Sequence, residues 1–229
     1  MMKRIILLRH GQSQWNLENR FTGWTDVPLS DNGKKEAIEA GRMLKKSGLL
    51  PDRCYTSVLK RAISTAFLAL EEADRLWIPV IRDWHLNERH YGALQGLDKT
   101  ETAEKYGAET VHQWRRSFDV LPPLLTPDDP RYPGKDPKYA ALSDDELPLA
   151  ESLQDTIARV RCCWEELIIP SFQSDATVMI AAHGNSLRAL AMVIQHLTAE
   201  EIVDVEIPTG KPWIFEVDSR MRVIKEYYL

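Results

Sequence analysis

Cysteine is scarce in this chain of 229 residues and gives no basis for a disulfide framework. The three cysteines, Cys54, Cys162 and Cys163, are odd in number and lack the C-x-x-C spacing of redox and zinc motifs. This usage is typical of a reducing compartment, so we expect a cytoplasmic protein. Metal-binding signatures of the H-E-x-x-H type are also lacking, and the sequence therefore predicts no metal site.

Long apolar runs and an excess of basic residues are missing as well. No stretch approaches the roughly 20 apolar residues that span a bilayer, and the aliphatic run after Lys3 and Arg4 is too short for a signal peptide. The net charge of −5 gives no basic surface for nucleic acid or an anionic membrane, and we expect neither as a partner. A site for an anion would have to be a local cluster of arginines.

The chain does contain an alternation of strand and helix patterns. Short apolar runs bounded by turn residues predict buried strands at 5–8, 54–56, 79–81, 178–182, 213–217 and 223–227. Helical spacing predicts helices at 30–47, 57–76, 99–106, 109–117, 152–169 and 187–197. This order favours an α/β fold with three layers, in which a mainly parallel sheet has helices on both faces.

Prolines are concentrated in one part of the chain. Six of the thirteen prolines lie between residues 121 and 137, and proline fixes its backbone and disfavours regular elements. We therefore expect residues 1–229 to form a single domain that carries a stiff, proline-rich insertion at about 117–148.

Two predicted strand ends carry the residues that are most informative about function. Arg-His-Gly at 9–11 follows the first strand, and His-Gly-Asn at 183–185 follows the strand at 178–182. Because α/β sheets bind ligands at the carboxyl ends of their strands, we expect His10 and His183 to meet there. Neutral imidazole is a competent nucleophile near pH 7, and the planar fork of Arg9 suits two phosphate oxygens. The alternative is that each histidine is an ordinary buried residue at a turn.

Two further residues could complete a phosphoryl-transfer site. Arg61 lies in the first turns of a predicted helix. It could be a second phosphate-binding cation or a solvated surface residue. Transfer to or from a hydroxyl requires a group that moves a proton. Glu88 is our candidate for that group, and its alternative is a loop salt bridge with Arg89.

Three more cations lie close to the proline-rich segment. They are Lys99, Arg115 and Arg116. These three residues could form a second anion site, or they could be ordinary charged residues on a helix surface. Their meaning depends on whether the fold brings them near His10.

Together these segments resemble, along nearly the whole chain, the 2,3-bisphosphoglycerate-dependent phosphoglycerate mutases of the histidine phosphatase superfamily. The R-H-G motif marks only the superfamily. The runs N-R-F-T-G-W-T-D at 19–26 and N-E-R-H-Y-G-A-L-Q-G at 87–96 are specific to the mutase branch. The resemblance implies a mutase-like fold and an isomerase that interconverts 3-phosphoglycerate and 2-phosphoglycerate in glycolysis and gluconeogenesis.

The resemblance also implies a role for individual residues. His10 would be the phosphorylated nucleophile, Glu88 the proton donor and acceptor, and His183 the residue that stabilises the transferring phosphoryl group. The residues around that group would be Arg9, Arg61, Ser13, Asn16, Gly184 and Asn185. The rest of the substrate would be held by Thr22, Gly23, Arg89, Tyr91, Lys99, Arg115 and Arg116.

The same resemblance bears on cofactors and partners. It implies that 2,3-bisphosphoglycerate primes His10 by phosphorylating it and that no metal takes part. The partners would be small-molecule phosphoglycerates. Assembly into a dimer or tetramer is left open.

Other functions remain as alternatives. A phosphomonoesterase of the same superfamily would let water hydrolyse phosphorylated His10, and a minor bisphosphoglycerate mutase or phosphatase activity could use the same fold. A catalytically silent sensor or scaffold would not need both histidines, Glu88 and the arginines together. The extra cations Lys99, Arg115 and Arg116 favour a mutase, because a nonspecific phosphatase has less need to fix a second anion.

Overall fold

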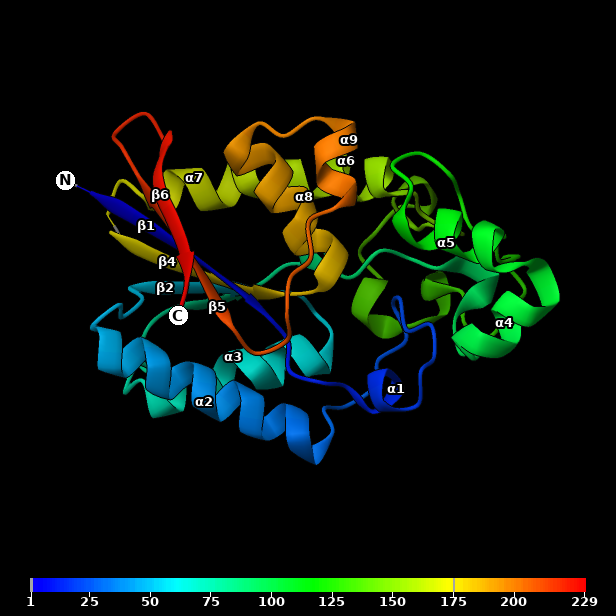
Figure 1. The fold of residues 1–229 in the computed structure, drawn as a ribbon, viewed down its shortest axis with the longest axis horizontal. Coiled ribbons are helices and arrows are strands. Elements are labelled where there is room, and N and C mark those ends of the chain that lie inside the picture. The colour runs from blue at the N-terminus through cyan, green and yellow to red at the C-terminus, as the bar shows by residue number, and fades with distance from the viewer. Residues whose placement is uncertain (1, 175) are drawn as a thin grey trace.

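A mixed sheet of six strands forms the centre of the computed structural model, which describes residues 2–174 and 176–229 (Figure 1). Its strand order is β3-β2-β4-β1-β5-β6. The strands are β1 (Lys3–Arg9), β2 (Arg53–Thr56), β3 (Val80–Arg82), β4 (Thr177–Ala182), β5 (Pro212–Val217) and β6 (Val223–Tyr228). The pairs β1–β4, β2–β4 and β2–β3 are parallel, whereas β1–β5 and β5–β6 are antiparallel.

Helices cover both faces of this sheet, which confirms the predicted three-layer α/β fold (Figure 1). One face carries α2 (Asp31–Ser47) and α3 (Lys60–Glu72). The other carries α6 (Leu153–Cys163), α7 (Ile169–Ser171), α8 (Gly184–Gln195) and α9 (Ala199–Val203). No helix in the described ranges is long and apolar enough to cross a membrane.

A lobe lies beyond the carboxyl ends of the parallel strands, on the right in Figure 1. It contains α4 (Lys99–Tyr106) and α5 (Ala108–Arg116), with α1 (Gln14–Leu17) below it. Short 3₁₀ turns complete this end of the molecule, at Trp84–Leu86, Gly92–Leu94, Pro133–Lys135, Pro137–Tyr139 and Asp144–Glu146. Tyr139 and Leu147 of the proline-rich segment pack with Trp24, so this segment is anchored close to the strand ends.

The apolar runs of the central strands supply both cores because successive side chains point to opposite faces. Ile5 and Leu7 of β1 pack under α6 and α8. Ile6 and Leu8 pack against α2 and α3. A strand buried on both faces has no polar alternation, which explains the continuous apolar pattern.

Several predicted boundaries were wrong. Ser57 does not cap a helix, because its hydroxyl contacts His183, and α3 begins at Lys60. This helix also ends at Glu72 rather than near 76. The helix expected at 187–197 begins three residues earlier, at Gly184, directly after the strand. The helix expected at 152–169 is interrupted by a π-helical turn at Trp164–Ile168.

Candidate active site

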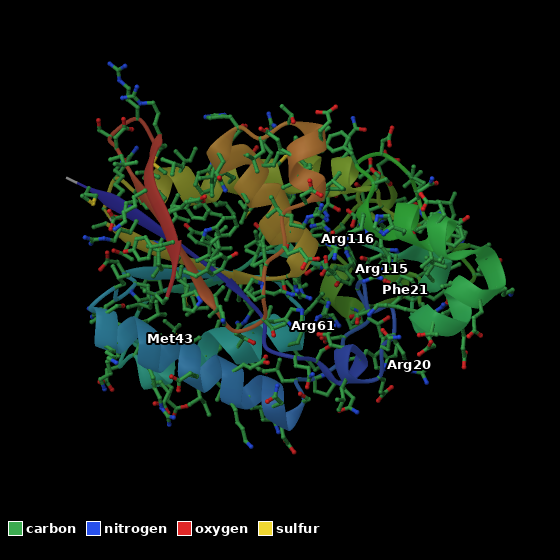
Figure 2. The ribbon with its side chains drawn as sticks, viewed as in Figure 1. Arg20, Phe21, Met43, Arg61, Arg115 and Arg116 are labelled. Atoms are coloured by element: carbon green, nitrogen blue, oxygen red, sulfur yellow. The ribbon has the colours of Figure 1, made fainter. Side chains whose placement is uncertain are left out.

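A pocket of about 390 Å³ opens between the carboxyl ends of the parallel strands and the α4–α5 lobe. Figure 2 shows Arg61 of α3 together with Arg20, Phe21, Arg115 and Arg116 in this region. The residues that line the pocket are Arg9, His10, Asn16, Arg20, Phe21, Thr22, Gly23, Arg61, Glu88, Tyr91, Lys99, Arg115, Arg116, Gly184, Asn185, Arg188, Val205, Glu206, Ile207 and Pro208.

Strand pairing brings the two predicted histidines together. Arg9 pairs with Ala182 in the β1–β4 register, and the His10 N–H donates to the Ala182 carbonyl over 2.9 Å. The next residue of each strand is therefore a histidine at the same sheet edge. The centroids of the His10 and His183 rings lie 5.0 Å apart, nearly edge to face.

The surroundings of His10 define its protonation state. Its Nδ1 lies 2.7 Å from the Gly11 carbonyl oxygen, which can only accept, so Nδ1 carries the hydrogen. Burial, followed by the charges of Arg61 and Arg9, holds the pKa of His10 well below its ordinary value of 6.5. The ring is thus neutral at pH 7, with its lone pair on Nε2.

His183 lies at the start of α8 and is fully buried. Its Nε2 is 2.8 Å from the Ser57 hydroxyl oxygen, and the Leu59 N–H donates to the same oxygen. Burial, with the charge of Arg61 next, keeps the pKa of His183 well below 6.5 in the ligand-free protein. A bound anion would offset the charge of Arg61 and favour a protonated, donating imidazole.

Glu88 has one oxygen saturated by the protein. Its Oε1 accepts from the Arg89 N–H at 2.8 Å, the Asn185 N–H at 3.1 Å and the Asn185 amide Nδ2 at 2.9 Å. The Asn185 amide is oriented by Arg188, which donates to Asn185 Oδ1. Oε2 lies next to Gly184 at the pocket wall. Glu88 can therefore exchange a proton at Oε2 without losing its position.

Backbone carbonyls, rather than carboxylates, hold the arginines nearest the strand ends. Arg9 donates to the Ile207 carbonyl over 2.8 Å, and Arg61 donates to the carbonyls of Gly23 and Thr25. Burial lowers the pKa of Arg61 to about 10, so it remains charged at pH 7. The charges of Glu88 and Asp26 act on Arg61 from nearby, but no ion pair with either is recorded, so its charge can still attract an anionic ligand.

The lobe adds a second group of cations to the far wall of the pocket. Lys99 lies at the start of α4, whereas Arg115 and Arg116 end α5. Burial and the charge of Arg115 lower the pKa of Lys99. Arg116 forms the one ion pair that the structure records between two pocket-lining residues, with Glu206 at 2.6 Å.

Most predicted site residues line the pocket, but three do not. His183 is fully buried beside His10. Ser13 is buried and caps α1 by accepting from the Asn16 N–H, so it supports Asn16. Arg89 is buried too, and it donates to the Arg115 carbonyl and the Tyr91 hydroxyl. The alternative interpretation of Glu88, a salt bridge with Arg89, is not what the structure records, because the contact there is from the Arg89 backbone N–H.

Other site residues were not identified from the sequence. Arg188 lines the pocket, and burial followed by the charge of Arg116 lowers its pKa to about 10. Arg159 donates to the carbonyl of Glu88 and pairs with Glu151 at 2.6 Å inside the protein. The Trp24 indole N–H also donates to the Glu88 carbonyl. The contacts of Arg159 and Trp24 with the Glu88 carbonyl join residues 71 and 64 positions apart, and of these two residues only Trp24 lies in a run that carries the resemblance.

This arrangement is suited to phosphoryl chemistry. A neutral imidazole with a free Nε2 lies beside guanidinium groups that can balance charge on phosphoryl oxygens. A carboxylate lies at the same wall and can move a proton to or from a hydroxyl. The fold and the site together define a class of enzymes that act on phosphate esters.

The chain belongs to the histidine phosphatase superfamily (branch 1), whose model matches residues 5–229. The fold is similar to that of mycobacterial glucosyl-3-phosphoglycerate phosphatase, solved with VO3, with 23% identity, a TM-score of 0.74, and 99% of this chain and 97% of that chain covered. It is also similar to a putative α-ribazole-5′-phosphate phosphatase from Escherichia coli, with 21% identity, a TM-score of 0.72, and coverage of 99% and 94%. Both of these structures are phosphatases by name. Membership of the superfamily rests on the family model, and the mutase branch is a proposal.

Proposed function

We propose that this protein interconverts 3-phosphoglycerate and 2-phosphoglycerate through a phosphohistidine and 2,3-bisphosphoglycerate. The observation that carries the proposal is that one pocket contains two separate clusters of cationic side chains. Arg9 and Arg61 lie at the strand ends near His10, and Lys99, Arg115 and Arg116 line the pocket from the lobe. A ligand with two anionic groups fits this distribution better than a simple phosphomonoester does.

Each group near His10 has a task in this proposal. The Nε2 of His10 attacks the phosphorus and takes the phosphoryl group, while Arg9 and Arg61 balance charge on its oxygens. His183 donates a hydrogen bond to the same oxygens. Glu88 gives a proton to the departing alkoxide and later removes one from the attacking hydroxyl, at Oε2 in both directions.

The cofactor implied by this function fits the residues present. The guanidinium groups of Arg9, Arg61 and Arg188 have no recorded ion pair with a carboxylate within the described parts of the chain, so their charges are available to a polyanion. When bound, 2,3-bisphosphoglycerate supplies the phosphoryl group that primes His10. The lobe cations hold its other phosphate and its carboxylate.

Hydrolysis of phosphomonoesters is the second candidate function. The solved structures described above are named as phosphatases, and this favours the alternative. In this alternative water, activated by Glu88, would take the phosphoryl group from His10. The same chemistry at His10 serves both functions, so the difference lies in what accepts the phosphoryl group.

The experiment that separates the two functions measures isomerisation and hydrolysis in one reaction. The purified protein is incubated with 3-phosphoglycerate, with and without 2,3-bisphosphoglycerate, and ³¹P spectra follow 2-phosphoglycerate and inorganic phosphate. We expect 2-phosphoglycerate to form faster than phosphate and to depend on added 2,3-bisphosphoglycerate. Release of phosphate without isomerisation would establish the phosphatase.

Arg116→Ala should lower isomerisation far more than hydrolysis of 4-nitrophenyl phosphate, which has no second anion. Charge-assisted hydrogen bonds of this kind contribute about 1.5–3 kcal/mol, enough to shorten the lifetime of a bound bisphosphorylated intermediate by about ten-fold or more. The measurement is the ratio of the two rates in wild type and variant. An unchanged ratio would place mutase specificity elsewhere, for example in Glu88 and its loop.

Chelating agents should leave activity intact, because arginines supply the positive charge at the proposed phosphoryl site. Activity is measured before and after dialysis against EDTA, and again with added Mg²⁺, Mn²⁺ or Zn²⁺. Vanadate should inhibit under the same conditions by imitating five-coordinate phosphorus beside His10. Loss of activity in EDTA that a divalent ion restores would contradict the arginine-based mechanism.

A further inference from the structure

We infer that Glu206 determines specificity by competing with the far anionic group of the ligand for Arg116. Glu206 Oε1 lies 2.6 Å from Arg116 Nη2, and both residues line the pocket. The two residues come from opposite walls: Arg116 ends α5 in the lobe, whereas Glu206 lies between α9 and β5. The carboxylate therefore takes the place of an anion at the lobe end of the pocket.

The presence of a carboxylate here needs an explanation. Seven cationic side chains line the pocket, and Glu88 and Glu206 are the only acidic residues that the structure records among the lining residues. Glu88 has a place in the proposed chemistry. Glu206 has none, and it reduces the positive charge on a residue that would hold the ligand.

The backbone on either side of Glu206 is fixed by two arginines of the site. Arg188 donates to the Ile202 carbonyl over 2.6 Å, and Arg9 donates to the Ile207 carbonyl over 2.8 Å. The Gly210 N–H also donates to the Arg9 carbonyl. The segment that carries Glu206 is thus built onto the site, and its carboxylate reaches Arg116 from an anchored backbone.

The ion pair can open at small energetic expense. The side chain of Glu206 is 74% exposed and that of Arg116 is 30% exposed, so the carboxylate enters water when it leaves. Exposed ion pairs contribute little to stability, whereas a phosphate can bind Arg116 through two hydrogen bonds. An incoming anion can therefore displace Glu206, and Glu206 can return as the product leaves.

This exchange would weaken binding and speed release only for ligands that reach Arg116. The inference rests on the proposed function to the extent that such a ligand carries two anionic groups. It deepens that function because it determines how tightly the site holds ligands with a second anionic group. Ligands that occupy only the end near His10 would be nearly insensitive to Glu206.

The test is calorimetric binding of two probes to wild type and to Glu206→Gln. The probes are 3-phosphoglycerate, which has two anionic groups, and vanadate, which has one. We expect the Kd of 3-phosphoglycerate to fall about two- to five-fold in the variant, the range that corresponds to loss of an exposed ion pair. The Kd of vanadate should change by less than about two-fold on the same scale. Asp204→Asn, a matched neutralisation two residues away at an exposed position outside the pocket lining, should change neither.

A double variant tests whether Glu206 acts through Arg116. In Arg116→Ala, the further change Glu206→Gln should give no additional tightening, because the two residues share one interaction. An unchanged or weaker affinity for 3-phosphoglycerate in Glu206→Gln, or the same tightening without Arg116, would overturn the inference. Binding is measured without turnover, so failure of mutase activity in the ³¹P experiment would be a separate result.

Discussion

Replacement of His10 with alanine is expected to abolish phosphoenzyme formation and to lower turnover by at least ~10⁴-fold. His10 lines the pocket together with Arg9 and Arg61 and has an unprotonated Nε2, whereas His183 is fully buried and is not among the lining residues. The measurement is acid-labile phosphate on the protein after incubation with ³²P-labelled 2,3-bisphosphoglycerate. The loss should be the same with 4-nitrophenyl phosphate, because both reactions begin at this nitrogen.

His183→Ala is the matched comparison for His10→Ala. It keeps the nucleophile and removes one donor to the phosphoryl oxygens, which typically slows a reaction by about 10²–10³-fold. Labelled phosphate should therefore still appear on His10, but more slowly. Recovery of the label on His183 in wild type would reverse the two roles.

Glu88→Gln should lower the rate with phosphoglycerates by about 10²–10⁴-fold, the usual contribution of a positioned acid or base. The glutamine oxygen can still accept from the Arg89 N–H and the two Asn185 groups, so the variant keeps the local geometry. With 4-nitrophenyl phosphate, formation of the phosphoenzyme should be affected much less, because 4-nitrophenolate leaves without a proton. The measurement is the burst of 4-nitrophenolate against the steady-state rate.

Glu104→Gln, an exposed position on α4, provides the control for this variant and should change neither rate. A burst that is retained while steady-state turnover falls would support proton transfer by Glu88. Equal losses in the burst and in the steady state would instead assign Glu88 a role in positioning the phosphoryl group.

The layers of the fold could be predicted because the strands carry strong local signals. The apolar runs of β1 and β4 lack polar alternation, as strands covered on both faces do. The place of β5 could not be predicted, because its apolar pattern does not encode antiparallel pairing beside β1. The helix start at Lys60 was missed because Ser57 resembles a cap but contacts His183, 126 residues away.

The site could be predicted where a residue with catalytic chemistry directly follows a predicted strand. His10 and His183 follow predicted parallel strands, and such strands end at the same edge. Arg159 and Glu206 gave no comparable signal, since a charged residue on a helix or in a loop is ordinarily solvated. Their contacts with Glu88 and Arg116 depend on segments brought together over 71 and 90 residues.

The end of the pocket near His10 and the end near Arg116 are built from different parts of the fold, and this difference bears on how the superfamily can diversify. The residues around His10 are tied to the strand ends, where a shift would disturb the shared core of the sheet. Lys99, Arg115 and Arg116 belong to the α4–α5 lobe, which contributes its own small apolar cluster with Phe21, Leu94 and Val111. Mutations in the lobe can therefore accumulate and alter which alcohol or acid is accepted while the nucleophile stays in place. A fold arranged in this way can give rise to enzymes with one chemical step and many substrates.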